Sequence, residues 1–159
     1  MPILLYRVDE RLIHGQVVIG WGNALRPDRL LIVDEELAAS GWEQELYRLG
    51  AGDMEVLFTD VRTAREALIE WRSDPSRTIL LTRDVATMRA LSEGGGLAGE
   101  EVNLGGLHHG PGRTEALTYL HLSDAERDDL RAMRSEGTRV SARDLPDAHR
   151  VRLDTLLGE

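Results

Sequence analysis

ILLYRVDERLIHGQV, residues 3–17, joins a continuous apolar run to a polar turn and then to the start of a helical pattern. The apolar run at 3–8 is typical of a strand that is buried on both faces of a parallel sheet. The polar turn brings two arginines, two acids and His14 close together. A strand that leads through such a turn into a helix is the repeating unit of α/β folds. The stretch therefore indicates the fold class and singles out His14.

Three later runs, LLIV, MEVLF and TILL, repeat this pattern and alternate with amphipathic segments. Predicted strands lie at residues 3–8, 29–34, 54–59, 77–82, 101–104, 115–120 and 138–142. Predicted helices lie at 15–25, 35–49, 61–72, 84–92 and 123–134, and a last helix follows Pro146 and continues through Leu157. This alternation predicts an α/β fold: an open, doubly wound, mostly parallel sheet of about seven strands flanked by helices.

Composition limits the class of protein. The 159 residues contain no linker, repeat or low-complexity stretch, so we expect residues 1–159 to form a single domain. The net charge of −9 argues against a general nucleic-acid surface, which needs a basic face. We see no signal-peptide pattern and no apolar run of the roughly 20 residues that span a bilayer. We therefore expect a cytoplasmic protein that does not itself span a membrane.

The chemistry is expected beyond the carboxyl ends of the strands, where open α/β sheets bind their ligands. Asp9, Arg11 and His14 follow the first strand, and His14 directly precedes a predicted helix. An arginine offers a planar fork to phosphate oxygens, a helix N-terminus favours anions, and a carboxylate can fix a histidine tautomer. These residues fit a phosphate placed on or next to the imidazole. A structural histidine within a solvated ion-pair cluster is the alternative.

The sequence gives little support for a metal or cofactor. His108 and His109 are adjacent, and neighbouring residues rarely converge on one ion; no histidine spacing typical of a zinc site occurs. Cysteine is absent, which excludes thiolate ligands and disulfides. The glycines of GGLHHGPG are also explained by a tight turn. We expect no metal and no cofactor.

A phospho-receiver module is a competing hypothesis. It places acids after the first strand, an acceptor aspartate after the third and a hydroxyl after the fourth, which here are Asp9 with Glu10, Asp60 and Thr82. Such modules also need a lysine after the fifth strand, but all 19 basic residues of this chain are arginine. Asp60 and Thr82 are equally well explained as N-caps of the helices that follow them.

The segment RVDERLIHGQVVIGW resembles the N-terminal signature of the enzyme IIB component of the mannose/fructose/sorbose-type bacterial sugar phosphotransferase system. LLIVDEELA, LTRDVATMRALSEGG, EVNLGGLHHGPGR and LHLSDAERDDLRAMRSEGTRVSARDLPD are similar to later blocks of that family, in the same order. The resemblance therefore extends over nearly the whole chain. It implies a protein-histidine–sugar phosphotransferase that works without a cofactor.

The resemblance also implies the roles of particular residues. His14 would accept a phosphoryl group on Nδ1 from a phosphohistidine of a IIA component and pass it to a sugar entering through a IIC/IID membrane permease. Asp9 and Arg11 match the loop-organising acid and the phosphate-contacting arginine. Arg7, Gly15 and Gln16 match further positions that bind phosphate or organise the loop. The weaker candidates in the later loop are Gly105, Gly106 and His108.

Two questions stay open at the level of the sequence. A free-standing IIB protein can serve sugar transport, or it can be a regulatory phospho-switch that binds a non-transport partner. The resemblance does not fix the sugar, and it is compatible with a homo-oligomer. The receiver-like alternative, phosphorylated on Asp60, predicts a different acceptor from His14.

Overall fold

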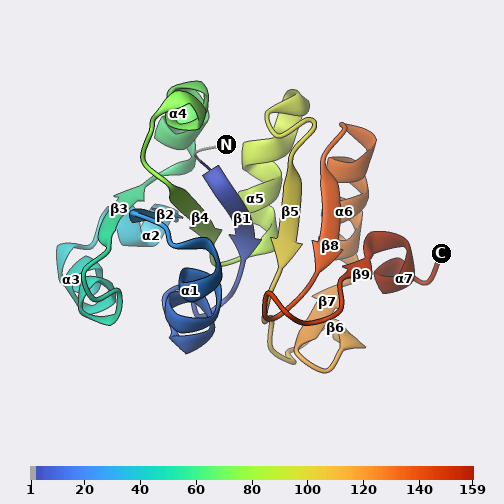
Figure 1. Cartoon of the computed structure of the whole chain (residues 1–159). Helices are drawn as coiled ribbons and strands as arrows, with labels where there is room; N and C mark the ends of the chain where they lie inside the picture. The colour runs from blue at the N-terminus through green and yellow to red at the C-terminus, as the bar shows by residue number, and fades with distance from the viewer. Residues whose placement is uncertain (1–2) are drawn as a thin grey trace.

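The computed structural model describes residues 3–159, which form one α/β domain around a seven-stranded sheet (Figure 1). The strand order is β3-β2-β4-β1-β5-β8-β9, and every neighbouring pair is parallel except β8 and β9. The strands are β1 (Ile3–Val8), β2 (Arg29–Val33), β3 (Glu55–Thr59), β4 (Thr78–Thr82), β5 (Glu101–Leu104), β8 (Arg139–Ala142) and β9 (Val151–Arg152). The predicted fold class is confirmed.

Helices cover both faces of this sheet. Their bounds are η1, a π-helix (Gln16–Trp21), α1 (Gly22–Leu25), α2 (Glu35–Ala38), α3 (Gly41–Gly50), α4 (Val61–Ser73), α5 (Val85–Ser92), η2, a 3₁₀ turn (Glu93–Gly95), α6 (Asp124–Ser135) and α7 (Leu153–Leu157). Two apolar clusters fill the layers. One packs η1, α2 and the end of α3 against β2 and β3, and the other packs α4, α5, α6 and α7 against the opposite face.

The buried strands explain why the sheet forms. All five residues of β2 and all five of β4 are buried, so both faces of these strands lie under helices. Continuous apolar runs suit such strands because there is no solvent-facing side to be polar. Asp34, Asp60 and Asp84 cap α2, α4 and α5, and Ser123 with Glu126 forms the predicted capping box of α6. The sequence thus encodes the strand-to-helix turns directly.

The predicted strand at 115–120 is wrong. This segment turns back on itself and forms a separate antiparallel hairpin of β6 (Arg113–Leu117) and β7 (Leu120–Ser123), beyond the carboxyl ends of β5 and β8 (Figure 1). The seventh strand of the main sheet is instead β9, whose two residues carry no periodic signal. The turn between β6 and β7 contains no glycine, proline or asparagine, the residues that normally mark a hairpin.

Three predicted helices also differ from the structure. The helix at 15–25 begins as the π-helix η1 and ends as α1. The helix at 35–49 is divided into α2 and α3, because Ser40 is extended and Gly41 begins a new helix. The last helix is confined to α7, because β9 occupies the residues before it.

The order of the strands places a crevice at the end of β1. The connection from β1 leads to β2 on one side, whereas the connection from β5 leads to β8 on the other. Neighbouring strands whose connections diverge in this way leave an opening at their carboxyl ends, where α/β proteins bind ligands. The loop that contains His14 and the loop that begins at Gly105 therefore meet at this opening.

Candidate functional site

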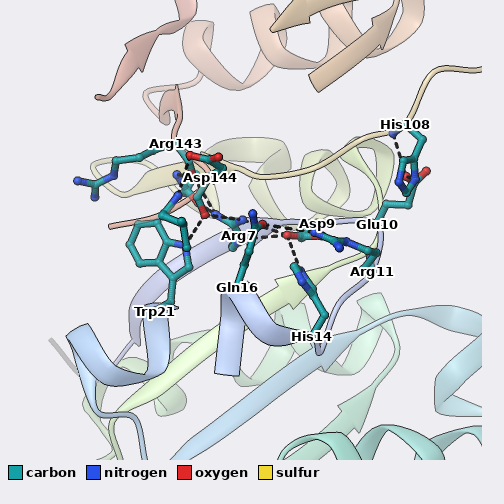
Figure 2. A network of polar contacts seen from close by, with 12 residues as sticks. Arg7, Asp9, Glu10, Arg11, His14, Gln16, Trp21, His108, Arg143 and Asp144 are labelled. Carbon is teal, nitrogen blue, oxygen red and sulfur yellow. Dashed lines mark hydrogen bonds and ion pairs between the residues drawn. The ribbon is translucent and has the colours of Figure 1, made fainter. Parts of the chain in front are cut away.

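Asp9 is the centre of the site, because its carboxylate joins three neighbours (Figure 2). Oδ2 accepts hydrogen bonds from Arg7 Nε at 3.2 Å and Nη2 at 3.0 Å, and it contacts His14 Nε2 at 2.9 Å. Oδ1 accepts the backbone N–H of Arg11 at 3.1 Å. Burial raises the pKa of Asp9, but the hydrogen bond to His14 and the charge of Arg7 lower it by more, so the pKa of this carboxyl lies below its ordinary value.

The contact with Asp9 determines which nitrogen of His14 is available for chemistry. An ionised carboxylate only accepts hydrogen bonds, so the His14 nitrogen that faces it, Nε2, carries the ring hydrogen. In a neutral imidazole the other nitrogen, Nδ1, then holds the free lone pair. The His14 side chain is 13% exposed, so it lies at the surface of the site and not within the core. The geometry therefore presents one nucleophilic nitrogen in a fixed orientation.

The turn that precedes His14 is held in an uncommon backbone conformation. Leu12 has a φ of 56°, in the left-handed region, and its side chain is fully buried in the core. Its N–H donates to the Asp9 carbonyl at 3.0 Å, which closes the turn. A leucine in this region is costly, and the burial of its side chain holds it there. The turn consequently fixes the path of the chain between Asp9 and His14.

The helix after His14 begins as a π-helix. Val17 and Val18 both donate their backbone N–H groups to the His14 carbonyl, at 3.0 and 2.9 Å. Gly15, at the N-cap, is exposed, and a side chain there would meet nothing within 4 Å. π-helical turns are rare and often occur at functional sites. The predicted helix start is present, and the chain continues from it as the π-helix η1 over Gln16–Trp21.

Arg11 and Gln16 lie next to each other on the exposed side of this loop. Arg11 Nη2 donates to Gln16 Oε1 at 3.4 Å. Within residues 3–159, no carboxylate lies at ion-pair distance from the Arg11 guanidinium. Arg11 is therefore a solvent-facing cation in the turn that leads to His14, free to bind an anion.

Arg7 differs from Arg11 because it is fully buried. Besides Asp9, its guanidinium donates to Asn103 Oδ1 at 2.5 Å and to the carbonyls of Arg143 and Asp144 at 2.9 and 3.1 Å. It also lies 5.4 Å from the centre of the Trp21 ring. These contacts organise the loop, and burial keeps Arg7 from reaching a phosphate in the crevice (Figure 2).

Asn103 and Trp21 belong to this cluster but are not among the residues predicted from the sequence. Asn103 lies directly opposite Arg7 in the pairing of β1 and β5, and its Nδ2 donates to the Arg143 carbonyl at 3.2 Å. Trp21 donates from Nε1 to the Asp144 carbonyl at 2.9 Å. The one available signal was a polar asparagine inside the buried strand β5. Its partners are distant in the chain and become neighbours only in the folded sheet.

The second loop meets the first through Glu10. Glu10 donates its backbone N–H to the Gly106 carbonyl at 3.0 Å, and its carboxylate accepts the His108 backbone N–H at 2.8 Å and pairs with the exposed His108 ring. Arg113 lies 3.5 Å from the same carboxylate and binds Glu126, at the start of α6, through two 3.0 Å hydrogen bonds. Of the weaker sequence candidates, His108 thus borders the site beside Glu10, away from Arg7 in Figure 2.

Gly105 has a different role from the one expected of it. Its N–H donates to the Val8 carbonyl at 2.7 Å, and its missing side chain leaves the space that the Arg7 guanidinium fills. Gly106 is less confined, because a Cβ there would have its nearest neighbours at 3.9 and 4.0 Å. Gly105 therefore allows Arg7 to approach the backbone of the second loop.

The structure does not assemble the receiver-like site. Asp60 follows the edge strand β3, and both β2 and β4 separate it from the acids that follow β1. Its carboxylate accepts the Thr63 N–H at 2.8 Å, so it is the predicted cap of α4. Thr82 was expected to cap the next helix, but that prediction is wrong. Asp84 caps α5, and Thr82 donates its hydroxyl to the Asp84 carbonyl at 2.9 Å.

Residues 3–159 contain no group of three histidine, aspartate or glutamate side chains arranged to hold a metal ion. In the same range, no helix has the length and apolar character needed to cross a membrane.

Comparisons with known proteins place the chain in a family. Residues 3–159 match the family described as the PTS system sorbose subfamily IIB component. The chain is 31% identical over 147 residues to the N-acetylgalactosamine-specific phosphotransferase enzyme IIB component 1 of Escherichia coli (strain K12), which covers 91% of each protein. It is 23% identical to the PTS system mannose-specific EIIAB component of the same strain, covering 100% of this chain and 49% of that protein.

Solved structures show the same architecture. The fold matches the crystal structure of manxB from Thermoanaerobacter tengcongensis with a TM-score of 0.86 and 27% sequence identity, covering 99% of this chain and 95% of that one. The family match and the fold extend over nearly the whole described chain, and the 31% identity to the N-acetylgalactosamine-specific relative extends over 91% of the chain. The chain therefore belongs to the sorbose subfamily of IIB components of the phosphotransferase system.

Proposed function

We propose that this chain is a cytoplasmic phosphocarrier in which His14 accepts a phosphoryl group from a phosphohistidine of a IIA component. His14 then passes the group to a sugar that is imported by a IIC/IID permease. The contact that carries the proposal is the 2.9 Å hydrogen bond between His14 Nε2 and Asp9, which leaves Nδ1 as the nucleophile. The chain then acts as a protein-histidine–sugar phosphotransferase.

The first transfer follows from the fixed tautomer. The Nδ1 lone pair forms a bond to phosphorus, the nitrogen–phosphorus bond of the donor breaks, and its electron pair returns to the donor imidazole. The His14 ring keeps its Nε2 hydrogen and becomes positively charged. Asp9 stabilises this charge through the hydrogen bond that already exists. Arg11, which has no carboxylate partner in the described chain, binds the phosphoryl oxygens.

The second transfer reverses the roles of His14. A sugar hydroxyl oxygen forms a bond to phosphorus, the nitrogen–phosphorus bond on Nδ1 breaks, and the hydroxyl proton passes to solvent. A carrier has to release the group that it accepts, so its site should stabilise phosphate only in part. One exposed arginine and one partly exposed histidine fit this requirement better than an enclosed pocket.

The relatives support the proposed partners by their names. The relative from Escherichia coli that is specific for N-acetylgalactosamine is called a phosphotransferase enzyme IIB component. The mannose-specific relative carries both a IIA and a IIB designation in one protein, and this chain matches about half of it. A IIA unit covalently joined to a IIB unit supports direct transfer between the two.

The test is a reconstituted relay. The chain is incubated with labelled phosphoenolpyruvate, enzyme I, the histidine phosphocarrier and a cognate IIA component, and vesicles containing IIC, IID and a candidate sugar are then added. We expect the label to enter this chain and to move to the sugar only with the vesicles. The matched control is His121→Ala, which alters a histidine on β7 and should leave both steps intact.

Failure of either step overturns a defined part of the proposal. A chain that never receives label from any IIA component contradicts the phosphocarrier function. A chain that is labelled but passes nothing to any sugar contradicts the transport role and supports the regulatory phospho-switch.

A further inference from the structure

One carboxylate oxygen serves both Arg7 and His14. Asp9 Oδ2 lies 3.0 Å from Arg7 Nη2 and 2.9 Å from His14 Nε2. Because both groups bind the same atom, they lie within the roughly 4–6 Å over which one charge alters the ionisation of another. Arg7 and Asp9 are both fully buried, so water screens this interaction weakly. The arrangement is a buried ion pair with an imidazole on its outer side.

Pairing an imidazole with a carboxylate alone has two opposing effects on the reactivity of the ring. The hydrogen bond fixes the tautomer, but the negative charge also favours the protonated ring. A protonated ring has no lone pair on Nδ1 and cannot attack phosphorus. A positive charge on the far side of the carboxylate opposes this effect while leaving the hydrogen bond in place. Arginine suits this position because it stays protonated when buried.

We infer that Arg7 is a positioning residue that offsets the charge of Asp9, so that Asp9 orients His14 but favours protonation of its ring less than an unpaired carboxylate would. This inference rests on the proposed phosphocarrier function and adds a reason for the buried arginine. Arg7 acts through Asp9 and does not contact the phosphoryl group.

The residues around Arg7 keep its guanidinium beside Asp9. Asn103 Oδ1 and two carbonyls accept its remaining N–H groups, and the Trp21 ring lies against it. These hydrogen-bonding partners are neutral, so within residues 3–159 Asp9 is the one carboxylate that binds Arg7 directly, and the charge of Asp144 acts on Arg7 without a side-chain hydrogen bond. A guanidinium fixed by five hydrogen bonds cannot turn toward the crevice.

Other charged groups face this pair from the elements packed around it. Arg11 and Glu10 belong to the same loop, Arg143 and Asp144 follow β8, and Tyr119 lies in the turn between β6 and β7. None of their side chains forms a hydrogen bond with Asp9 or His14 among the described residues. They remain unchanged in the variants below, so they affect every pH profile alike.

The test is the pH dependence of His14 phosphorylation by the IIA component. In Arg7→Met the acid limb of the rate profile should move to higher pH by about one unit, a loss of roughly tenfold on that limb, with recovery at alkaline pH. A purely structural role for Arg7 would lower the rate by the same factor at every pH. A uniform loss therefore overturns the inference.

A second variant avoids removing a buried charge. Asn103→Asp has the same shape as the wild-type residue and places a carboxylate against Arg7, on the side away from His14. The new carboxylate should cancel the Arg7 charge. The acid limb of the rate profile should then move to higher pH, as in Arg7→Met. The matched control, Asn103→Ala, removes the hydrogen bond without adding charge and should leave the position of the limb unchanged.

The outcomes separate this inference from the proposed function. If the wild-type chain accepts no phosphoryl group, the phosphocarrier proposal fails. If the wild type is phosphorylated but Asn103→Asp gives the same acid limb as Asn103→Ala, only the role assigned to Arg7 is wrong.

Discussion

The Arg7 guanidinium fills the space beside the α-carbon of Gly105, where any other residue would place its side chain. This contact joins β1 to the loop after β5 and keeps Arg7 against Asp9. The glycine is thus required by an arginine that lies far from it in the sequence. Backbone flexibility does not explain it, because Gly105 has no positive φ angle.

Gly105→Ala should consequently destabilise the fold and displace Arg7. Overpacking of a buried site typically costs about 1–3 kcal/mol, which urea unfolding measures directly. Gly106→Ala is the matched control, because its Cβ would have no neighbour closer than 3.9 Å. Equal stability of the two variants would show that Gly105 is not constrained by Arg7.

Arg11→Ala should slow phosphorylation while leaving the fold intact. Loss of one charged donor to a transferring group typically lowers the rate by about 10²-fold, and substitution of an exposed residue changes stability by about 0.5 kcal/mol or less. Arg62→Ala removes a 90% exposed arginine from α4 and should change neither the phosphorylation rate nor the stability of the fold. A large fall in melting temperature in Arg11→Ala would instead support a structural ion-pair cluster.

Asp9→Asn should change how stability depends on pH. The pKa of Asp9 is lowered in the folded protein, so its ionised form stabilises the fold above the unfolded pKa of about 3.9, and this contribution is lost as the pH falls through the folded pKa. At neutral pH the variant leaves buried Arg7 unpaired, which typically costs about 3–5 kcal/mol.

Urea unfolding of wild type and Asp9→Asn at a series of pH values checks this prediction. The difference in unfolding free energy should be largest at neutral pH and should shrink as the solution becomes acidic. A difference that stays constant across the series would mean that folding does not lower the pKa of Asp9.

An exposed apolar face on α3 borders the His14 loop. Trp42, Leu46 and Leu49 are 69%, 58% and 80% exposed, and a hollow of about 300 Å³ lies between this helix and Ile13, the neighbour of His14. Exposed apolar patches often mark protein contacts. A IIA protein that reaches His14 lies beside this face, so we expect it to cover these side chains.

Trp42→Ala should therefore raise the KM for the phosphorylated IIA component by about tenfold, the effect of one well-placed aromatic contact, and should leave kcat nearly unchanged. Ile69→Ala is the control, because Ile69 is 79% exposed on α4, which packs on the opposite face of the sheet. Similar KM values for both variants would exclude α3 from the docking surface.

The sequence predicts those parts of the fold that depend on local pattern. β2 and β4 are continuous apolar runs, and the caps at Asp34, Asp60 and Asp84 are local hydrogen bonds. The β6–β7 hairpin and β9 were not predicted, because a turn without glycine or proline and a two-residue strand have no periodic signal. Their positions depend on packing against the rest of the domain.

Some residues of the candidate site could be predicted from the sequence, and others could not. His14 and Asp9 are close in the sequence, so the polar turn after β1 was sufficient to select them. The burial of Arg7 was not predictable, because arginine is normally exposed and its hydrogen-bond partners other than Asp9 lie 96 to 137 residues away. Only the folded sheet brings Asn103 and the chain after β8 against it.

The most direct test of the central claim is to locate the phosphoryl group. The ¹⁵N-histidine-labelled chain is phosphorylated by its IIA component and examined by ³¹P and ¹⁵N NMR, with His14→Ala and His108→Ala beside it. The account predicts one phosphoryl group on Nδ1 of His14, absent from His14→Ala and retained in His108→Ala. Label that persists in His14→Ala, or a phosphate on Nε2 of His14, would contradict it.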